Sequence, residues 1–115
     1  MELISDDECR RASAIIEFVG RRWNSAIMLA LGRGATRFSE VEAMVAGISA
    51  RMLSTRLREL EQHGLVDRVV TPTTPVSVTY HLTPRGSELL AALHAVARYG
   101  RRWEAGPDRT TEQAH

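Results

Sequence analysis

The sequence changes its periodicity at Gly64, and this change constrains the fold more than any other feature. Before Gly64, apolar residues recur at helical spacing; after it, residues 65–70 and 76–82 are β-branched and partly alternating. Residues 71–75, between these stretches, contain two prolines, which lack the backbone donor that a strand ladder requires. We therefore predict helices before Gly64 and, over about residues 65–82, an antiparallel β-hairpin with a stiff tip.

Two helices are predicted at the amino end of the chain. Ser5 and Glu8 have the spacing of a capping box, and the apolar pattern that follows predicts a first helix over about residues 6–19. A second apolar stretch covers residues 23–31 and ends at Gly32. Its density of apolar residues predicts a helix that is buried on more than one side.

The next two predicted helices are separated by a short turn that contains a glycine. Ser39 and Glu42 form a second capping-box pair at the start of a short helix, and Ser49 caps a longer helix over residues 50–63. A short helix, a tight turn and a longer helix make up the helix-turn-helix motif of DNA-binding proteins, here over about residues 39–63.

A last helix is predicted after the hairpin. Thr83 and Pro84 provide an N-cap and a proline at the first helical position of a helix over about residues 84–103. Residues 104–115 have no apolar period, and we expect a disordered tail there. The order of elements predicts a mainly α-helical single domain over residues 1–103 with a small β-hairpin wing, which is a winged helix-turn-helix.

The helix predicted over residues 50–63 has two different faces. On a helical wheel, Leu53, Leu57 and Leu60 fall on one side and predict the buried stripe. The opposite side carries Arg51, Ser54, Thr55, Arg58 and Gln62. Arginine can donate two hydrogen bonds to guanine in the major groove, and hydroxyl groups can bind phosphates or base edges. This face is therefore predicted to bind DNA.

Residues around this face complete the predicted DNA-binding set, because the amino end of a helix attracts phosphate. The set comprises Arg37, Ser39, Ser49, Arg51, Met52, Ser54, Thr55, Arg58, Thr73 and Thr74. The wing tip contributes only threonines, since it has no arginine. Arg56 lies nearer the apolar stripe, and two roles remain open for it: an internal ion pair with Glu59 or Glu42, or a contact to phosphate.

Composition narrows the class of function. The 115 residues include 15 basic and 14 acidic side chains, and all the basic ones are arginine, which suits forked contacts to phosphate and guanine. One cysteine excludes an internal disulfide framework, and the four histidines have no metal-binding spacing. Because no catalytic motif is present, we expect no enzyme, cofactor or metal. No apolar run is long enough to span a membrane, which predicts a cytoplasmic protein.

Several segments resemble the HxlR-type subfamily of MarR-like winged-helix transcriptional regulators. The similar segments are residues 20–23 (GRRW), 37–40 (RFSE), 47–61 (GISARMLSTRLRELE), 64–66 (GLV) and 78–86 (VTYHLTPRG). The resemblance implies a homodimer that binds double-stranded DNA, with the first and last helices at the dimer interface. A twofold pair would read a palindrome, because each chain offers one DNA-reading helix. The wing segment before Tyr80 departs from the family in having no arginine, which argues against a minor-groove contact.

The regulation of such a protein has several possible routes. The resemblance implies that Cys9 senses oxidants or electrophiles, although no proline follows it as it does in the family; the other interpretation is a buried, inert thiol. Phe18, Trp23 and Trp103 either belong to the core or line a pocket for a small-molecule effector. A winged helix that binds a protein instead of DNA is a further alternative, favoured by the basic-poor wing and by the formal net charge of only +1. His63 is expected to interact with the carboxyl end of its helix.

Overall fold

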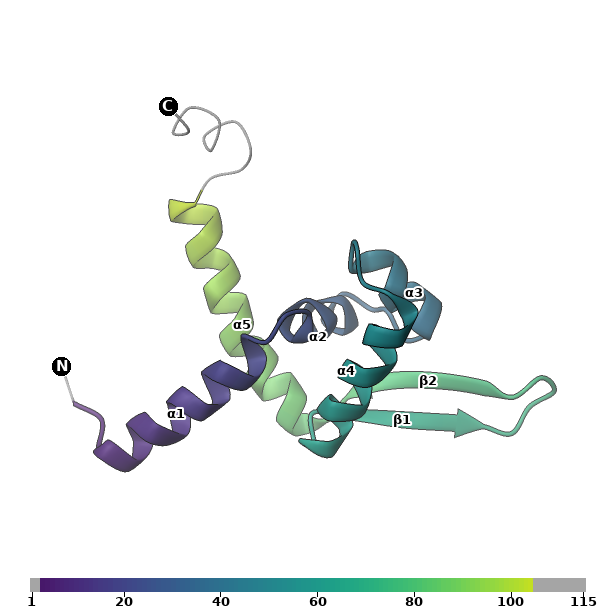
Figure 1. The fold of residues 1–115 in the computed structure, drawn as a ribbon, viewed down its shortest axis with the longest axis horizontal. Helices are drawn as coiled ribbons and strands as arrows, with labels where there is room; N and C mark the ends of the chain where they lie inside the picture. The colour runs from purple at the N-terminus through teal and green to yellow at the C-terminus, as the bar shows by residue number, and fades with distance from the viewer. Residues whose placement is uncertain (1–2, 105–115) are drawn as a thin grey trace.

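The computed structural model describes residues 3–104 of the chain. Within this range the chain forms five helices and a two-stranded antiparallel sheet (Figure 1). The elements are α1 (Asp6–Val19), α2 (Asn24–Gly32), α3 (Phe38–Met44), α4 (Ala50–Gln62), β1 (Val66–Thr71), β2 (Ser77–Leu82) and α5 (Pro84–Trp103). This order confirms the predicted winged helix-turn-helix, with α3 and α4 as the helix-turn-helix. The predicted tail lies, after Glu104, outside the described residues.

The core forms where α2, α3, α4, α5 and the base of the hairpin meet. The predicted stripe of α4 is confirmed, because Leu53, Leu57 and Leu60 are each at most 1% exposed. Ile27 and Met28 of α2 are fully buried as well, so this short helix is enclosed on several sides. Burying a large apolar side chain stabilises the fold by roughly 1.5–3 kcal/mol. The leucine stripe therefore determines which face of α4 points to solvent.

The caps of the long helices follow the sequence signals. The hydroxyl of Ser5 accepts the N–H of Glu8, and the Glu8 carboxylate accepts the N–H of Ser5 in return. The hydroxyl of Ser49 accepts the N–H of Met52 at the start of α4, and the hydroxyl of Thr83 accepts the N–H of Gly86 at the start of α5. Gly64 has φ +72°, the left-handed conformation that a glycine adopts without strain after a helix end.

The capping box predicted at Ser39 and Glu42 is wrong. The helix begins two residues earlier than this pair requires, and its N-cap is Arg37, whose backbone is extended. The carboxylate of Glu40 reaches back and accepts the N–H groups of Thr36 and Arg37, each at 2.9 Å. These donors hold the pKa of Glu40 below its ordinary value, with the N–H of Thr36 as the larger cause, because they stabilise the charged form.

Glu40→Gln is expected to lower the melting temperature at pH 7, because a neutral amide oxygen accepts more weakly than a carboxylate. A carboxyl group whose pKa is lower in the folded than in the unfolded state stabilises the fold above its unfolded pKa. That contribution disappears as the pH falls through the folded pKa. The difference between wild type and variant should therefore shrink as the pH is lowered from 7 into the acidic range, measured by thermal unfolding. A difference that does not change with pH would contradict this role; Glu42→Gln on the same helix is the matched control.

The hairpin is attached to the helical body at its base. The N–H of Tyr80 donates to the carbonyl oxygen of Thr36 at 2.7 Å, which joins β2 to the loop before α3. Both strands begin one residue later than predicted. For β1 the reason is that the N–H of Leu65 donates to the carbonyl oxygen of Leu60 in the turn after α4. The pairing runs from Val66 opposite Leu82 to Thr71 opposite Ser77.

The helices α1 and α5 extend from the body on the side away from the hairpin (Figure 1). No residue of α1 is buried, and only the amino-terminal half of α5 contributes to the core. Both helices leave large apolar side chains exposed. These are Ile15, Ile16, Val96, Tyr99 and Trp103. Within residues 3–104, no helix is both long and apolar enough to cross a membrane.

Candidate nucleic-acid interface

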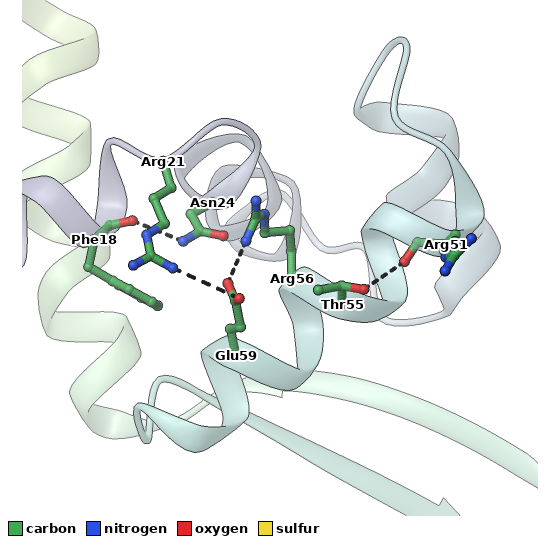
Figure 2. A network of polar contacts seen from close by, with 7 residues as sticks. All are labelled: Phe18, Arg21, Asn24, Arg51, Thr55, Arg56 and Glu59. Carbon is green, nitrogen blue, oxygen red and sulfur yellow. Dashed lines mark hydrogen bonds and ion pairs between the residues drawn. The ribbon is translucent and has the colours of Figure 1, made fainter.

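The outer face of α4 brings together four of the ten predicted DNA-binding side chains. Arg51, Ser54, Thr55 and Arg58 are exposed on the side of α4 opposite the buried leucines. Among the described residues, neither Arg51 nor Arg58 forms an ion pair. The hydroxyl of Thr55 donates to the carbonyl oxygen of Arg51 at 3.1 Å (Figure 2), so its oxygen remains available as an acceptor. The face therefore presents two free guanidinium groups beside two hydroxyl groups.

The amino end of α4 offers further donors to an anion. The hydroxyl oxygen of Ser49 accepts the N–H of Met52 at 3.1 Å, which leaves the hydroxyl hydrogen of Ser49 able to donate outward. Met52 itself is half-buried and packs partly against the core, so only a part of its side chain reaches the surface. Backbone N–H groups and the helix dipole favour phosphate at such an end.

Arg56 does not belong to the exposed basic face. Its side chain is 19% exposed, and its Nη1 lies 2.7 Å from Oε1 of Glu59. The other carboxylate oxygen of Glu59 lies 3.9 Å from Nη1 of Arg21, in the segment before α2 (Figure 2). Of the two roles left open for Arg56, the structure shows the internal ion pair, and its partner is Glu59 rather than Glu42.

The remaining predicted residues lie apart from the α4 face. Arg37 and Ser39 are exposed at the amino end of α3. At the wing tip the hydroxyl of Thr73 donates to the carbonyl oxygen of Pro75 at 2.8 Å, so its hydrogen is used inside the loop. Thr74 is exposed. The structure thus gathers the α4 residues into one surface and leaves the contacts of the other positions as predictions.

One basic residue of the wing was missed by the sequence reasoning. Arg68 is exposed on β1, opposite Tyr80 in the hairpin register, and it forms no ion pair among residues 3–104. Arginine is absent from the wing tip and from the segment before Tyr80, but not from β1. The alternating pattern of residues 65–70 is the signal that could have identified this residue, because it places Arg68 in a strand of the wing rather than in a helix.

Cys9 is exposed in the second turn of α1. The alternative of a thiol buried within its own chain is therefore not what the structure shows. Cys9 is also the one cysteine of the sequence. A disulfide would consequently have to join two chains or bind a small thiol.

A groove of about 420 Å³ lies between α1 and α5, close to the carboxyl end of α4. Its lining is mostly apolar, with three titratable side chains: it consists of Ala14, Ile15, Phe18, His63, Leu65, Arg85, Glu88, Leu89 and Ala92. The pocket predicted from three aromatic residues is therefore only partly correct, since Phe18 alone lines this groove. Trp23 instead occupies the N-cap position of α2, with the guanidinium of Arg22 over its ring, and Trp103 lies at the far end of α5 beneath Arg102.

His63 has a contact that the sequence did not reveal. It is the C-cap of α4, where an interaction with the helix end was expected. Its ring also stacks on the ring of Phe18, with centroids 3.8 Å apart and an interplanar angle of 25°. The end of α4 is therefore in direct contact with the end of α1.

Sequence comparison identifies relatives over most of the chain. The family model of the HxlR-like helix-turn-helix matches residues 18–107. YvaP of Bacillus subtilis strain 168, an uncharacterized HTH-type transcriptional regulator, is 39% identical over 95 residues, which cover 83% of this chain and 88% of YvaP. The HTH-type transcriptional regulator YodB of the same strain is 42% identical over 83 residues, which cover 72% and 74% of the two chains.

Solved structures agree with this assignment. The reduced form of YodB superposes with a TM-score of 0.75 and 34% identity, covering 91% of this chain and all of that chain. The redox regulator HypR in its oxidized form gives a TM-score of 0.74 and 29% identity, covering 80% of this chain and 95% of that chain. This chain therefore belongs to the HxlR-like helix-turn-helix family of transcriptional regulators.

Proposed function

We propose that this protein is a homodimeric, sequence-specific regulator that reads DNA with the outer face of α4. The observation that carries the proposal is that Arg51 and Arg58, which the buried leucine stripe holds outward, form no ion pair within residues 3–104. Arg51 lies in the first turn of α4, the part of a recognition helix that enters the major groove. A guanidinium there can donate to O6 and N7 of one guanine, while hydroxyl groups beside it serve bases or phosphates.

The other predicted residues have supporting roles in this proposal. Ser49 and the amino end of α4 hold a phosphate, and Arg37 and Ser39 hold another at the amino end of α3. In the wing, Arg68 and Thr74 contact the DNA backbone, since neither side chain forms a hydrogen bond or an ion pair within the described part of the chain. These contacts place the protein on DNA without reading its sequence.

The homodimer is supported by the exposed apolar side chains of α1 and α5. Ile16, Val96 and Tyr99 are each more than 60% exposed in the single chain. Contiguous exposed apolar surface on a small domain marks an interaction site. A twofold pair joined through these helices would hold two copies of α4 at a fixed separation, as a palindromic operator requires.

Selection of bound duplexes from a random library by the purified protein tests the function. We expect a twofold-symmetric sequence whose half-sites lie about one helical turn, roughly 10 base pairs, apart. Light scattering should give twice the chain mass of 12.8 kDa, and affinity should fall steeply as the salt concentration rises. Failure to enrich any sequence, together with tight, salt-independent binding to a protein, would identify a protein-interaction module instead.

We further propose control through Cys9, because its thiol is exposed and two structural relatives are a diamide-treated YodB and an oxidized HypR. Diamide is expected to join two chains through a Cys9–Cys9 disulfide: two thiols lose two protons and two electrons, which reduce diamide to the hydrazine. Non-reducing electrophoresis should show a species of twice the chain mass, and operator affinity should change. Cys9→Ser is the control and should respond in neither measurement; unchanged operator affinity of the oxidized protein would contradict the proposal.

The groove between α1 and α5 supports a second route of control, by a small apolar effector. Its lining combines apolar side chains with Arg85 and Glu88, the usual composition of a small-molecule site. A thermal-shift screen with reduced protein separates this route from the thiol, because a ligand would raise the melting temperature of wild type and Cys9→Ser alike.

A further inference from the structure

The attachment of α1 to the rest of the molecule is confined to its carboxyl end. No residue of α1 is buried, and only Phe18 and Val19, in its last turn, pack against the core. The remaining turns, including the one that carries Cys9, are exposed. Any displacement of α1 is therefore transmitted to the body through the segment between α1 and α2.

This segment is held rigidly against the start of α2. Asn24 is fully buried, and its Nδ2 donates to the carbonyl oxygen of Phe18 at 2.9 Å (Figure 2). Trp23, just before it, has φ +85°, a left-handed conformation that a residue with a side chain adopts only when its surroundings impose it. The last turn of α1 and the first turn of α2 consequently move together.

The last turn of α1 and the segment that follows it contact the carboxyl end of α4 at two points. The ring of Phe18 stacks on His63, and Nη1 of Arg21 lies 3.9 Å from a carboxylate oxygen of Glu59. Glu59 in turn binds Arg56 at 2.7 Å, so that one carboxylate joins α4 to the α1–α2 segment (Figure 2). The DNA-reading side chain of Arg51 is on the same continuous helix, about 12 Å away along its axis at 1.5 Å per residue.

We propose that Phe18, Arg21 and Glu59 are positioning residues that set the orientation of α4, and that they transmit displacements of α1 to it. The proposal rests on DNA reading by α4, as proposed above. A rigid helix held at its carboxyl half carries its amino half with it. A small rotation at Glu59 therefore moves Arg51 relative to the base edges and relative to the second copy of α4 in a dimer.

The test measures affinity for the selected operator and for a scrambled duplex of the same length. Arg21→Ala and Glu59→Gln are each expected to weaken operator binding by about fivefold, the upper range for an ion pair that remains partly solvated. The double variant should bind no more weakly than Glu59→Gln alone, because both changes break the same link. Affinity for the scrambled duplex should stay within about twofold, since it depends on phosphate charge rather than on half-site geometry.

The direction of the change in affinity and its salt dependence distinguish a positioning role from a purely electrostatic effect on DNA binding. Glu59→Gln removes a negative charge, which by charge alone would tighten DNA binding; positioning predicts weaker operator binding. If Arg21 contacted a phosphate directly, Arg21→Ala would lower the slope of log affinity against log salt by about 0.9. Positioning leaves that slope unchanged. Arg10→Ala is the matched control, because the ion pair of Arg10 is with Asp7 inside α1.

Tighter operator binding by Glu59→Gln, a reduced salt slope for Arg21→Ala, or unchanged operator affinity in all variants would overturn the proposal. An equal loss on both duplexes would also overturn it, because a lower folded fraction reduces both affinities alike. The side chain of Arg21 is 57% exposed, so its removal should leave the protein folded. Arg21→Ala therefore still tests the proposal if Glu59→Gln does not fold. If wild type and Arg10→Ala both fail to prefer the operator, the proposed function itself is wrong, and this inference with it.

Discussion

Gly86→Ala is expected to lower the free energy of unfolding by about 3 kcal/mol or more, the upper range for an overpacked site. A Cβ at this position would lie 2.1 Å from the carbonyl oxygen of Leu65 and 3.0 Å from its carbonyl carbon. Both atoms are backbone, and the Leu65 oxygen already accepts the N–H of Thr83 at 3.0 Å. No side-chain rotation can relieve the contact, so the start of α5 has to move away from the turn between α4 and the wing.

Gly100→Ala on the same helix is the matched control. Among the described residues, a Cβ there would meet no heavy atom within 4 Å apart from its chain neighbours and the backbone of its own helix. Because alanine is favoured over glycine inside a helix by about 1 kcal/mol, this variant should be slightly more stable than wild type. Chemical unfolding followed by circular dichroism measures both changes. A Gly86→Ala protein as stable as Gly100→Ala would show that α5 does not approach Leu65 as closely as the structure shows.

The second large effect concerns DNA affinity. The double variant Arg51→Ala with Arg58→Ala is expected to lose at least about 100-fold in affinity for the selected operator, because each arginine that binds a guanine contributes about 1–3 kcal/mol. Both side chains are exposed and form no ion pair among the described residues, so their removal should leave the fold intact. Titration of labelled operator and of a scrambled duplex, at several salt concentrations, measures the change.

Arg10→Ala with Arg11→Ala controls for net charge, since it removes the same two positive charges from α1. Light scattering should confirm that both double variants keep the oligomeric state of wild type. We expect the α1 double variant to bind the operator within a few-fold of wild type, because exposed charges far from DNA are screened by salt. Equal losses on operator and scrambled duplex for the α4 double variant would assign Arg51 and Arg58 to phosphates and contradict base reading.

Much of the fold could be predicted because its signals are local. The capping pair of Ser5 and Glu8, the N-cap at Ser49 and the Thr83–Pro84 start each specify a helix end within four residues. The hairpin followed from β-branched stretches around a proline-containing tip. In each case the sequence separation between the interacting groups is so small that one backbone conformation satisfies them.

The wrong capping box and the role left open for Arg56 both arose where two local solutions compete. Glu40 and Glu42 are both placed to cap the short helix, and the extended backbone of Arg37 decided for Glu40. Arg56 had two acidic partners within reach, and the packing of α4 against the α1–α2 segment selected Glu59. The groove could not be predicted from aromatic residues, because its walls come from α1, α4 and α5.

The amino-acid sequence by itself determined the order of the elements and which face of α4 is outward, because hydrophobic period and capping act over one or two helical turns. The tertiary structure decided the links between elements: Phe18 on His63, Asn24 on the Phe18 carbonyl, and Arg21 and Arg56 on Glu59. Phe18 and His63, and Arg21 and Glu59, are far apart in the chain. Asn24 lies six residues from Phe18 and Arg56 three residues from Glu59, but neither spacing by itself specifies the contact. Only the packing of helices around the common core brings one of them within bonding distance.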